Sequence, residues 1–425
     1  MSEETKKAPA IRFQGFTDDW EQRKLGDTFE FSVSTNSLSR AQLNYEKGNI
    51  KSIHYGDILI KYNSILEITK DKIPFITNGS IEKYKPNLLE NGDVVFADAA
   101  EDETVGKAVE INGISDEYVV AGLHTIVARP KEKMAKYFSG YYINADVYQR
   151  QLLRLMQGTK VSSISKGNLK KTIVAYPKNL AEQQKIGSFF KQLDDTIALH
   201  QRMSDKQKKL KANLLQMMFP RNGEKIPEVR LAGFVEDWSQ RTLEDISDKV
   251  TEKNKAREFT ETLTNSAEYG IISQSDYFDK DISNINNING YYVVRPDDFV
   301  YNPRISNFAP VGPIKRNNLN RIGIMSPLYY VFRPKRVDHT FLEKYFETSY
   351  WHIFMKMNGD SGARADRFAI KDTILKEMPI PYPIMEEQVK IGIFFNQLDK
   401  SIVLHQEKIA HLKILKSTLL NKMFI

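Results

Sequence analysis

The sequence predicts an α+β chain in which two similar α/β domains are separated by two long antiparallel coiled-coil helices, with a pseudo-two-fold internal repeat. Two repeated signals support this prediction. The stretch 180–219 returns at 384–424 with matching residues 205 positions apart, and the stretch 11–27 returns at 229–245 with matching residues 218 positions apart. The sequence therefore indicates a tandem duplication, in which each half has an opening segment, a mixed domain and a long helix.

Each half opens with a Gly-Phe pair that is followed by a tryptophan. The matched residues are Gly15, Phe16, Asp19, Trp20, Gln22 and Arg23 in the first half and Gly233, Phe234, Asp237, Trp238, Gln240 and Arg241 in the second. Phe and Trp are large apolar side chains that anchor a segment at the entrance of a domain. We therefore begin the first domain at 11 and the second at 229, with a linker at 221–228.

Between the opening and the helix, each half carries short β-rich runs separated by turns that are rich in Gly, Asn and Asp. Four pairs of segments keep the same order: 93–98 with 298–303, 105–106 with 311–312, 129–130 with 333–334, and Lys136-Tyr137-Phe138 with Lys344-Tyr345-Phe346. The residues around these segments differ. The two domains, 11–177 and 229–381, are thus predicted to share a scaffold and to carry different surfaces.

The long helices are predicted over 178–220 and 382–425. Pro177 and Pro383 disfavour helical geometry in the residue before them, so each helix is expected to begin just after its proline. Apolar residues then recur every three or four positions over roughly 38 residues, a rod of about 57 Å at 1.5 Å per residue. A spacing sustained over this length indicates coiled-coil packing, and two equivalent helices in one chain can pack as an antiparallel pair.

The apolar stripes of the two helices give the predicted helix-pair interface. Its members are Ile186, Phe189, Leu193, Ile197, Leu210 and Leu214 in the first helix and Ile391, Phe394, Leu398, Ile402, Ile409, Leu412, Leu415 and Leu419 in the second. His200 and His405 also fall on the stripe, where a packed histidine is favoured over a catalytic one. The first helix departs from the second at Ser204 and Gln207, which match the apolar Ile409 and Leu412, so looser packing is expected there.

The composition is that of a globular protein with a modest excess of positive charge. The formal net charge is +7 with a pI near 9.0, which favours an anionic partner such as nucleic acid without requiring one. The chain has no cysteine, so a disulfide framework and a thiolate metal site are excluded. No apolar leader or membrane-length apolar run occurs in the sequence, and a cytoplasmic protein that does not contact a membrane is expected.

The motifs of the common enzyme classes are missing. No two of the 22 glycines lie two positions apart, which excludes a dinucleotide-binding fingerprint, and Gly106-Lys107 lacks the upstream glycine of a phosphate loop. The seven histidines show no metal-binding spacing, so no metal site is predicted. No catalytic residue is assigned, and the sequence is interpreted as a binding scaffold.

The whole chain resembles the specificity subunit of type I restriction-modification enzymes. The resemblance rests on two diverged domains that open with Gly-Phe and Trp, each followed by a long helix that begins with Glu182-Gln183 or Glu387-Gln388 and continues to Lys-Ile-Gly. It implies that the two domains are target recognition domains, each of which reads one half of a bipartite DNA site. It also implies that the subunit is non-catalytic.

The same resemblance implies the partners and cofactors. The partners would be double-stranded DNA, two DNA-methyltransferase subunits that dock on the paired helices, and nuclease-translocase subunits recruited through them. The helices would also act as a spacer between the half-sites. No cofactor is expected in this chain, whereas S-adenosylmethionine, ATP and Mg would belong to the partner subunits.

Side chains that read bases in the major groove are mainly Arg, Lys, Asn and Gln on loops, and lysines that contact phosphates fix the register. The polar loops that differ most between the halves are therefore the candidate DNA-binding regions. The candidates are Lys61, Tyr62, Asn63, Lys160, Ser162, Ser163 and Lys166 in the first domain and Tyr301, Asn302, Arg304, Arg364 and Arg367 in the second. For each of them, a solvated surface position or a structural role is as consistent with the sequence as a base contact.

Two other functions fit the same features. A stand-alone bipartite DNA-binding regulator would have two reading domains but would act without a methyltransferase, so purification from the native host distinguishes it. A coiled-coil assembly scaffold that never contacts DNA is the other alternative, and a gel shift with the reconstituted complex tests it.

Overall fold

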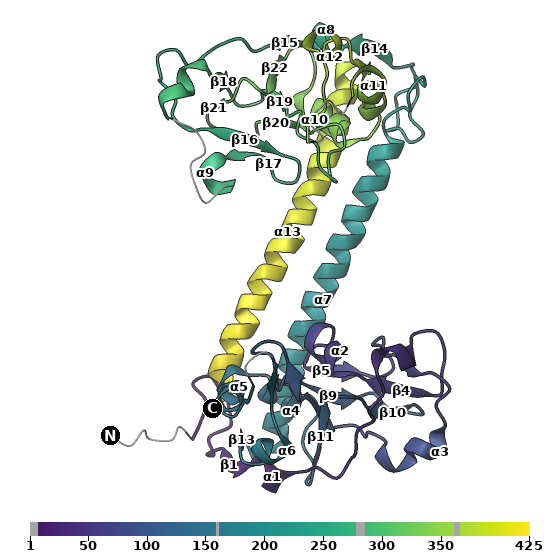
Figure 1. Cartoon of the computed structure of the whole chain (residues 1–425), viewed down its shortest axis with the longest axis vertical. Coiled ribbons are helices and arrows are strands. Elements are labelled where there is room, and N and C mark those ends of the chain that lie inside the picture. Colours follow the sequence, from purple (N-terminus) through teal and green to yellow (C-terminus); the bar gives the residue numbers. More distant parts are fainter. Residues whose placement is uncertain (1–6, 159–160, 278–284, 361–365) are drawn as a thin grey trace. The chain divides into compact units, whose positions relative to one another are not determined.

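The computed structural model describes residues 7–158, 161–277, 285–360 and 366–425. Packing divides the chain into two compact units, Met1–Gln201 with Glu407–Ile425 and Arg202–Gln406. Each unit holds one mixed domain together with part of each long helix (Figure 1). The compact units therefore differ from the segments expected from sequence, because each helix contributes to both units.

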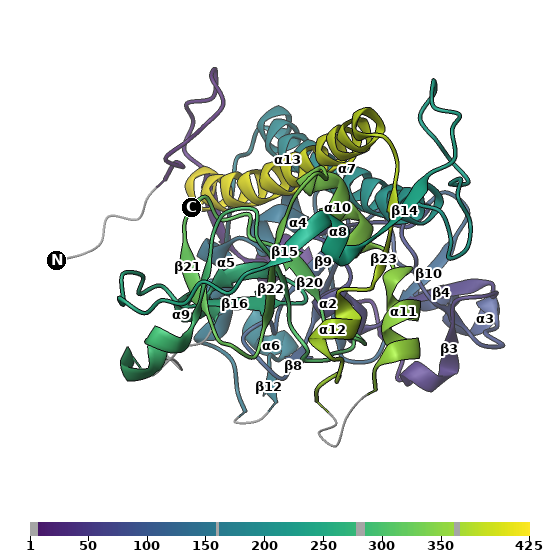
Figure 2. The same cartoon turned by 90° about the horizontal axis from the view of Figure 1, so that it is seen from above.

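The two long helices are unbroken. Helix α7 spans Leu180–Met217 over 38 residues and α13 spans Met385–Met423 over 39, and each begins shortly after the proline that precedes it. Within each unit the two helices lie side by side (Figure 1 and Figure 2). In the first unit Phe190 stacks on Phe424 and Asp194 pairs with Lys416, so residue numbers rise along one helix as they fall along the other. The expectation of an antiparallel pair is confirmed.

The first domain is built on two sheets. Its five-stranded sheet has the order β2-β11-β7-β9-β5 and its four-stranded sheet the order β10-β4-β6-β3. The pairs β5 with β9 and β4 with β10 are parallel, and the other pairs are antiparallel. The strands are β2 (Phe29–Glu30), β3 (Leu43–Asn44), β4 (Ile50–Ile53), β5 (Ile65–Glu67), β6 (Phe75–Ile76), β7 (Val94–Ala97), β9 (Ala108–Asn112), β10 (Tyr118–Ala121) and β11 (Thr125–Pro130).

Smaller elements complete the first domain. Two short antiparallel pairs are β1 (Glu21–Lys24) with β13 (Ile173–Tyr176) and β8 (Ala99–Ala100) with β12 (Ser162–Ser163). The helices are α1 (Leu25–Thr28), η1 (Arg40–Gln42), α2 (Tyr55–Ile60), α3 (Ile81–Tyr84), η2 (Lys85–Asn87), α4 (Phe138–Ile143), α5 (Asp146–Leu153) and α6 (Lys166–Leu169).

The second domain repeats the central part of the first. Its four-stranded sheet has the order β15-β22-β19-β20, which corresponds to β2-β11-β7-β9. Its strands are β14 (Ser239–Thr242), β15 (Ser247–Lys249), β16 (Leu263–Ser266), β17 (Gly270–Ser273), β18 (Tyr292–Val294), β19 (Phe299–Tyr301), β20 (Ile314–Arg316), β21 (Gly323–Met325), β22 (Tyr330–Pro334) and β23 (Pro379–Tyr382). Its helices are α8 (Leu243–Ile246), α9 (Gln274–Tyr277), η3 (Ile285–Gly290), α10 (His339–Glu347), α11 (Trp351–Asn358) and α12 (Asp372–Leu375).

The central strand of each sheet is apolar on both faces. In β7, Val94 and Phe96 pack in one hydrophobic cluster whereas Val95 and Ala97 pack in another, as the two-residue period of a strand requires. In β19, Phe299 and Val300 likewise belong to two different clusters. A continuous apolar run therefore marks a strand that is covered on both sides.

Each domain core is completed by the end of the helix that belongs to the other repeat. Phe424, near the end of α13, contacts Trp20, Phe138 and Phe190 in the first unit. In the second unit Phe219, which follows α7, contacts Trp238 and Phe341. Neither domain core is complete without both helices.

The Glu-Gln pair at the start of each long helix ties the opening segment to the helix. The buried carboxylate of Glu182 accepts hydrogen bonds from Arg12 Nε and Nη2 at 2.6 and 2.9 Å and from Trp20 Nε1 at 3.4 Å. Glu387 holds Arg230 and Trp238 in the same way. A buried carboxylate is stable here because a bidentate guanidinium neutralises it.

The glutamine of the pair is bonded on both of its polar atoms. Gln183 accepts a hydrogen bond from the Ala135 backbone N–H at 2.9 Å and donates to the Pro177 carbonyl oxygen at 2.8 Å. Four residues further on, a Cβ on Gly187 would lie 2.5 Å from the Lys136 carbonyl oxygen, so this position requires glycine. The Glu-Gln and Gly positions of the repeated motif thus serve the docking of the helix on its domain.

One predicted correspondence between the halves is wrong. Gln388 accepts from the Asp338 N–H, so Asp338 is the counterpart of Ala135. Phe341 then matches Phe138, and both contact a tryptophan of the opening segment. Lys136-Tyr137-Phe138 therefore does not correspond to Lys344-Tyr345-Phe346. The match of these three residue types is a coincidence, because it lies five residues out of the structural register.

We predict that Glu182→Ala lowers the free energy of unfolding by about 3–5 kcal/mol, because it leaves the mostly buried Arg12 guanidinium without its counterion. The matched control is Asp195→Ala, which removes an exposed pair with Lys191 on the same helix and should cost less than about 0.5 kcal/mol. Chemical denaturation measures both. Equal losses would show that the buried pair does not fix the opening segment.

Candidate nucleic-acid interface

In the first domain, a short two-stranded pair joins two of the loops that differ most between the two domains. The strand β12 pairs antiparallel with β8, and an isolated bridge joins Gln157 to Ser163. Ser163 is exposed and Ser162 is half-buried. The predicted DNA contact at Lys160 lies outside the described residues. These contacts bring Gln157 and β12 beside the segment that follows the central strand β7.

The second domain forms the same arrangement from different residues. Arg304 pairs with Arg367 through an antiparallel bridge, and Ile305 N–H donates to the Asp366 carbonyl oxygen at 3.0 Å. A second bridge joins Asp360 to Ala369. Because β7 and β19 correspond, the pair at Arg304 occupies the place of the β8–β12 pair. Within the residues that the structure describes, we call these two regions the variable hairpins: 98–100 with 157–158 and 161–164, and 303–305 with 360 and 366–369.

The variable hairpins present different chemistry. Arg304 is exposed and Arg367 is half-buried, and neither guanidinium makes an ion pair with another residue in the described ranges. By the register of the two pairs, the first domain has Ala99 and Ser163 at the matching place. The predicted contact at Arg364 lies outside the residues that the structure describes. The two domains thus carry two arginines in one case, and an alanine with a serine in the other, at the same place of a common scaffold.

Two predicted DNA contacts are wrong because their side chains belong to the domain cores. Tyr62 is buried, and its hydroxyl donates to the Lys72 carbonyl oxygen at 3.3 Å. Tyr301 is also buried and donates to the Val311 carbonyl oxygen at 3.0 Å. Burial raises the pKa of both phenols. Both rings fill apolar space in the way that amphipathic tyrosine allows, with one bonded oxygen.

Other predicted contacts have intramolecular hydrogen bonds. Asn302 Nδ2 donates to the Asn265 carbonyl oxygen at 2.8 Å, while its Oδ1 accepts from the Arg304 N–H at 3.0 Å. Lys166 Nζ donates to the Phe31 carbonyl oxygen at 3.1 Å. Lys61 pairs with the Asp57 carboxylate at 2.9 Å. Asn302 therefore shapes the second variable hairpin, and the two lysines remain exposed but anchored.

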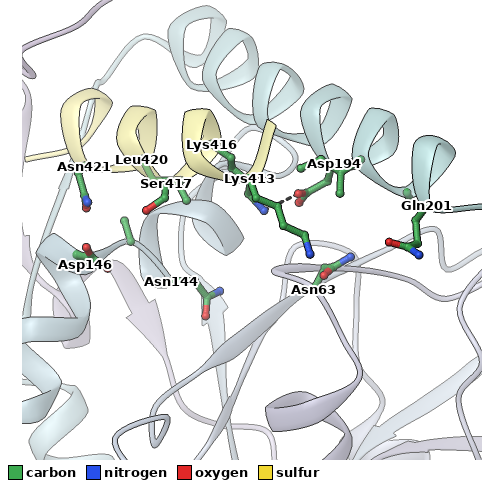
Figure 3. A pocket seen from close by; sticks show the side chains of 13 residues that line it. Asn63, Asn144, Asp146, Asp194, Gln201, Lys413, Lys416, Ser417, Leu420 and Asn421 are labelled. Atoms are coloured by element: carbon green, nitrogen blue, oxygen red, sulfur yellow. Dashed lines mark hydrogen bonds and ion pairs between the residues drawn. The ribbon is translucent and has the colours of Figure 1, made fainter. Parts of the chain in front are cut away.

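Asn63 lies away from the first variable hairpin, in a polar groove of about 390 Å³ beside the long helices. In Figure 3 the Lys413 side chain of α13 extends toward Asn63, and the Lys416–Asp194 pair lies further along the groove. Carboxylates, amides and lysines line this groove together. Its mixed lining gives it no preference for an anion.

Most of the predicted helix-pair interface lies on the side where the helices touch. Ile402, Ile409 and Leu412 are buried, and Leu193, Ile197 and Leu398 are half-buried at positions of the same stripe. At the helix ends the predicted residues pack into domain cores instead. These are Ile186, Phe189 and Leu419 in the first domain and Leu214, Ile391 and Phe394 in the second.

Phe189 and Phe394 need a correction, because the neighbouring phenylalanine is the buried one. Phe190 and Phe395 are fully buried, whereas Phe189 and Phe394 are half-buried. Phe189 packs edge-on against Phe13 of the opening segment at 6.0 Å. Consecutive phenylalanines point about 100° apart on a helix, so only one of each pair can face the partner helix.

Leu210 and Leu415 were predicted at the interface, and this prediction is wrong. Leu210 is 49% exposed and Leu415 is 39% exposed. The next residue of each helix, Lys211 or Lys416, continues the alternating three- and four-residue spacing and faces the partner helix. A prediction from apolar residues alone misses these two interface positions, because each is occupied by a lysine whose ammonium pairs with an acidic residue.

Those lysines form the ion pairs that link the helices. Lys416 Nζ lies 2.5 Å from Asp194 Oδ1 in the first unit, and Lys211 Nζ lies 2.6 Å from Asp399 Oδ1 in the second. The pairs are equivalent, because both the aspartates and the lysines are 205 positions apart. That repeated spacing is the signal by which sequence analysis could have found them. They fix the antiparallel register of the helices in each unit.

The aspartates are also bonded to their domains. Tyr141 donates to Asp194 at 2.8 Å, and Lys344, at the matching position of the second domain, pairs with Asp399 at 2.7 Å. Burial alone would raise the pKa of the Asp399 carboxyl, but hydrogen bonds from Lys211 and Lys344 outweigh it and hold the pKa below its ordinary value. Each aspartate thus joins both helices and one domain.

The second unit contains a polar layer of side chains at Ser204 and Gln207, where the sequence predicts looser helix packing. Ser204 is fully buried, and its hydroxyl has no hydrogen-bond partner among the described residues. Gln207 Nε2 donates to Ser401 Oγ at 2.9 Å, but its own Oε1 is buried without a partner. The matching positions in the first unit are Ile409 and Leu412, both buried. At this layer the helix pair is therefore polar in the second unit and apolar in the first.

Among the residues that the structure describes, no three acidic or histidine side chains come together as a metal site. In the same residues, no helix is long and apolar enough to span a membrane. The site is thus defined by two variable hairpins on matched domains and by the helices that the domains share. This arrangement defines a duplicated binding scaffold.

Comparison with known proteins identifies the scaffold. The model of the type I restriction modification DNA specificity domain matches residues 17–209 and again 235–413. A type I restriction enzyme specificity subunit, MjaX, of Methanocaldococcus jannaschii is 22% identical over 426 residues, which cover 95% of this chain and 92% of the relative. The chain therefore belongs to the family of type I restriction-modification specificity subunits, which are not themselves enzymes.

Solved structures show the same fold. The S subunit of a type I restriction-modification system from M. genitalium aligns with a TM-score of 0.57 at 14% identity, covering 98% of this chain and 99% of that one. A chain from a study of type I system assembly and conformational transition aligns with a TM-score of 0.50 at 17% identity, covering 95% and 97%. Both cover nearly the whole chain, so the duplicated architecture is that of the family.

We predict that Ser204→Ala raises the free energy of unfolding by about 1–2 kcal/mol, because it removes a buried hydroxyl without a partner and places a better helix former in α7. Ser417→Ala makes the same change at an exposed position of α13 and should give only the propensity gain, about 0.5 kcal/mol. Thermal or chemical unfolding compares the two variants. The same gain from both would mean that the hydroxyl of Ser204 is hydrogen-bonded in solution.

Proposed function

We propose that each domain of this specificity subunit reads one half of a bipartite DNA target. The observation that carries the proposal is the placement of the variable hairpins. They occupy the same position on matched strands, and one carries Ala99 and Ser163 where the other carries Arg304 and Arg367. A common scaffold with different hydrogen-bonding groups suits two different short sequences.

The chemistry of the second hairpin favours guanine. An arginine guanidinium can donate two hydrogen bonds to the O6 and N7 atoms of guanine in the major groove. Arg304 has its backbone N–H bonded to Asn302, while its side chain remains exposed. Serine hydroxyls can donate or accept and therefore suit several bases. The two half-sites are accordingly proposed to differ.

The long helices are proposed to dock two copies of a methyltransferase subunit. Leu199 and Leu404 are 48% and 65% exposed, and they are equivalent residues 205 positions apart. Leu210 and Leu415 form a second exposed equivalent pair. Each unit thus offers one exposed leucine from α7 and one from α13. Exposed apolar side chains that repeat in both units fit two identical partners.

The remaining family roles follow from this docking. Nuclease-translocase subunits would assemble through the methyltransferase subunits, and S-adenosylmethionine, ATP and Mg would act in those partners. The unbroken helices of 38 and 39 residues would set the number of unread bases between the half-sites. Sequencing of methylated bases in a host that carries this chain tests whether the target is bipartite.

We predict that Arg304→Ala changes recognition of one half-site only, because the loss of a bidentate guanine contact costs about 1–3 kcal/mol of discrimination. Methylation of a randomised duplex library by the reconstituted complex measures this. Arg321→Ala serves as the control, because that exposed arginine of the same domain is paired with Glu261. A uniform loss on all sequences would mark Arg304 as a phosphate contact.

We predict that Leu210→Asp with Leu404→Asp, both in the second unit, reduces the number of bound methyltransferase subunits from two to one. A charge at the centre of a buried apolar contact removes its contribution and adds a desolvation cost. Native mass spectrometry of the complex gives the stoichiometry. Lys208→Asp, at an exposed position of α7, should leave it at two. Retention of two partners by the double variant would place the docking surface elsewhere.

A further inference from the structure

In the first domain three cationic side chains surround one aromatic ring. Arg40 in η1, Lys61 after α2 and Lys72 lie 5.3, 5.0 and 5.0 Å from the centre of the Tyr45 ring. All three are exposed. We call these side chains, together with Asp57 beneath them, the Tyr45 cluster.

The cluster is positioned by a buried carboxylate. Asp57, in the first turn of α2, accepts from Arg40 Nη1 at 2.5 Å and from Lys61 Nζ at 2.9 Å. Burial alone would raise the pKa of the Asp57 carboxyl, but the hydrogen bonds from Arg40 and Lys61 outweigh it, so its pKa is lowered. The same two cations donate to the Tyr45 hydroxyl oxygen at 2.6 and 2.8 Å. Their positions are therefore set before any ligand binds.

The charges of the cluster do not balance. Three cations face one carboxylate, and in the described chain Lys72 makes no ion pair. Like charges held this close repel one another unless an anion lies between them. An exposed, preorganised excess of positive charge is the electrostatic form of an anion-binding site. The cluster thus lacks a negative partner.

The geometry of Arg40 shows which kind of anion fits. Its Nη1 and Nη2 atoms both donate to Asp57, and Nη2 also donates to the Tyr45 hydroxyl, so neither fork of the guanidinium is free for a guanine edge. Lysine ammonium groups act as point charges that suit phosphate oxygens. We propose that the Tyr45 cluster binds a phosphate of the DNA backbone. This inference rests on the proposed DNA-binding function of the domain.

The proposal reassigns Lys61, which the sequence placed among the candidate base readers. A phosphate contact carries no sequence information but fixes the register of the domain on the duplex. In the described part of the second domain, the tyrosines that lie under a cation each have one, as Tyr292 has Lys253. Among the described residues, a tyrosine surrounded by three cations therefore occurs in the first domain and has no counterpart in the second.

The test uses Lys61→Gln with Lys72→Gln in the full chain, reconstituted with its methyltransferase subunits. Binding to a target duplex and to a scrambled duplex is measured over a range of salt concentrations. Both affinities should fall by a similar factor, on the order of 10- to 100-fold at physiological salt. The slope of log affinity against log salt should become less steep by about 0.9 for each lysine–phosphate pair that the substitutions remove. The methylated sequence should not change.

The matched control removes the same charge elsewhere on the domain. Lys133→Gln with Lys178→Gln alters two exposed lysines outside the cluster and should leave affinity and salt slope unchanged. Tyr45→Phe keeps the ring and the charges but removes the acceptor that orients Arg40 and Lys61. This third variant should bind both duplexes more weakly while keeping the salt slope.

Three results would overturn the inference. A change in the methylated sequence would make Lys61 or Lys72 a base reader, and an unchanged affinity would make the cluster an intramolecular ion network only. Inorganic phosphate that binds the cluster of the wild type, but not of the double variant, without weakening DNA binding at constant ionic strength would assign the site to a free anion. Failure of the wild-type complex to bind any duplex would instead refute the proposed function itself, before any variant is compared.

Discussion

The structure depends on one packing constraint: each domain core is closed by the end of the helix from the other repeat. Phe424 fills the first core and Phe219 fills the second. Burying a phenylalanine contributes roughly 1.5–3 kcal/mol relative to leaving it exposed, so neither helix end can detach at low cost. The buried Glu182 and Glu387 fix the opposite ends of the same helices. Each helix is therefore anchored in both units of the chain.

This constraint explains why the two helix copies are more alike than the two domains. Each helix must pack against one domain at one end, against the partner helix along its length and against the other domain at its far end. Asp194 shows this, because it bonds Lys416 of the partner helix and Tyr141 of the first domain. Loop residues such as Ser163 meet no comparable demand, so they are open to change with the target.

The two units nevertheless differ where function is proposed to differ. The polar layer of Ser204 and Gln207 occurs only in the second unit, and the Tyr45 cluster only in the first, within the part of the chain that the structure describes. Duplication gave the two domains the same scaffold. We propose that the contacts with bases and with the DNA backbone differ between these domains. Arginines of the second variable hairpin are proposed to suit bases, whereas the cluster in which Asp57 holds Arg40 and Lys61 is proposed to suit a phosphate.

The duplication, the two unbroken helices and their antiparallel pairing follow from periodicity and from spacings of 205 and 218 residues. The family was indicated by the resemblance that the repeated Gly-Phe, Trp and Glu-Gln motifs carry. The sequence also located the polar layer, since Ser204 and Gln207 stand against apolar counterparts. Tertiary structure decided which side chains are available. Tyr62 and Tyr301 are buried, and Leu210 and Leu415 face outward beside lysines that take the interface positions. The repeated spacing marks Lys211 and Lys416 as equivalent residues, but a lysine becomes an interface residue only when an acidic partner from a distant segment neutralises it. The Tyr45 cluster likewise gathers Arg40, Lys61 and Lys72 from separate loops around one carboxylate, a convergence that exists only after folding.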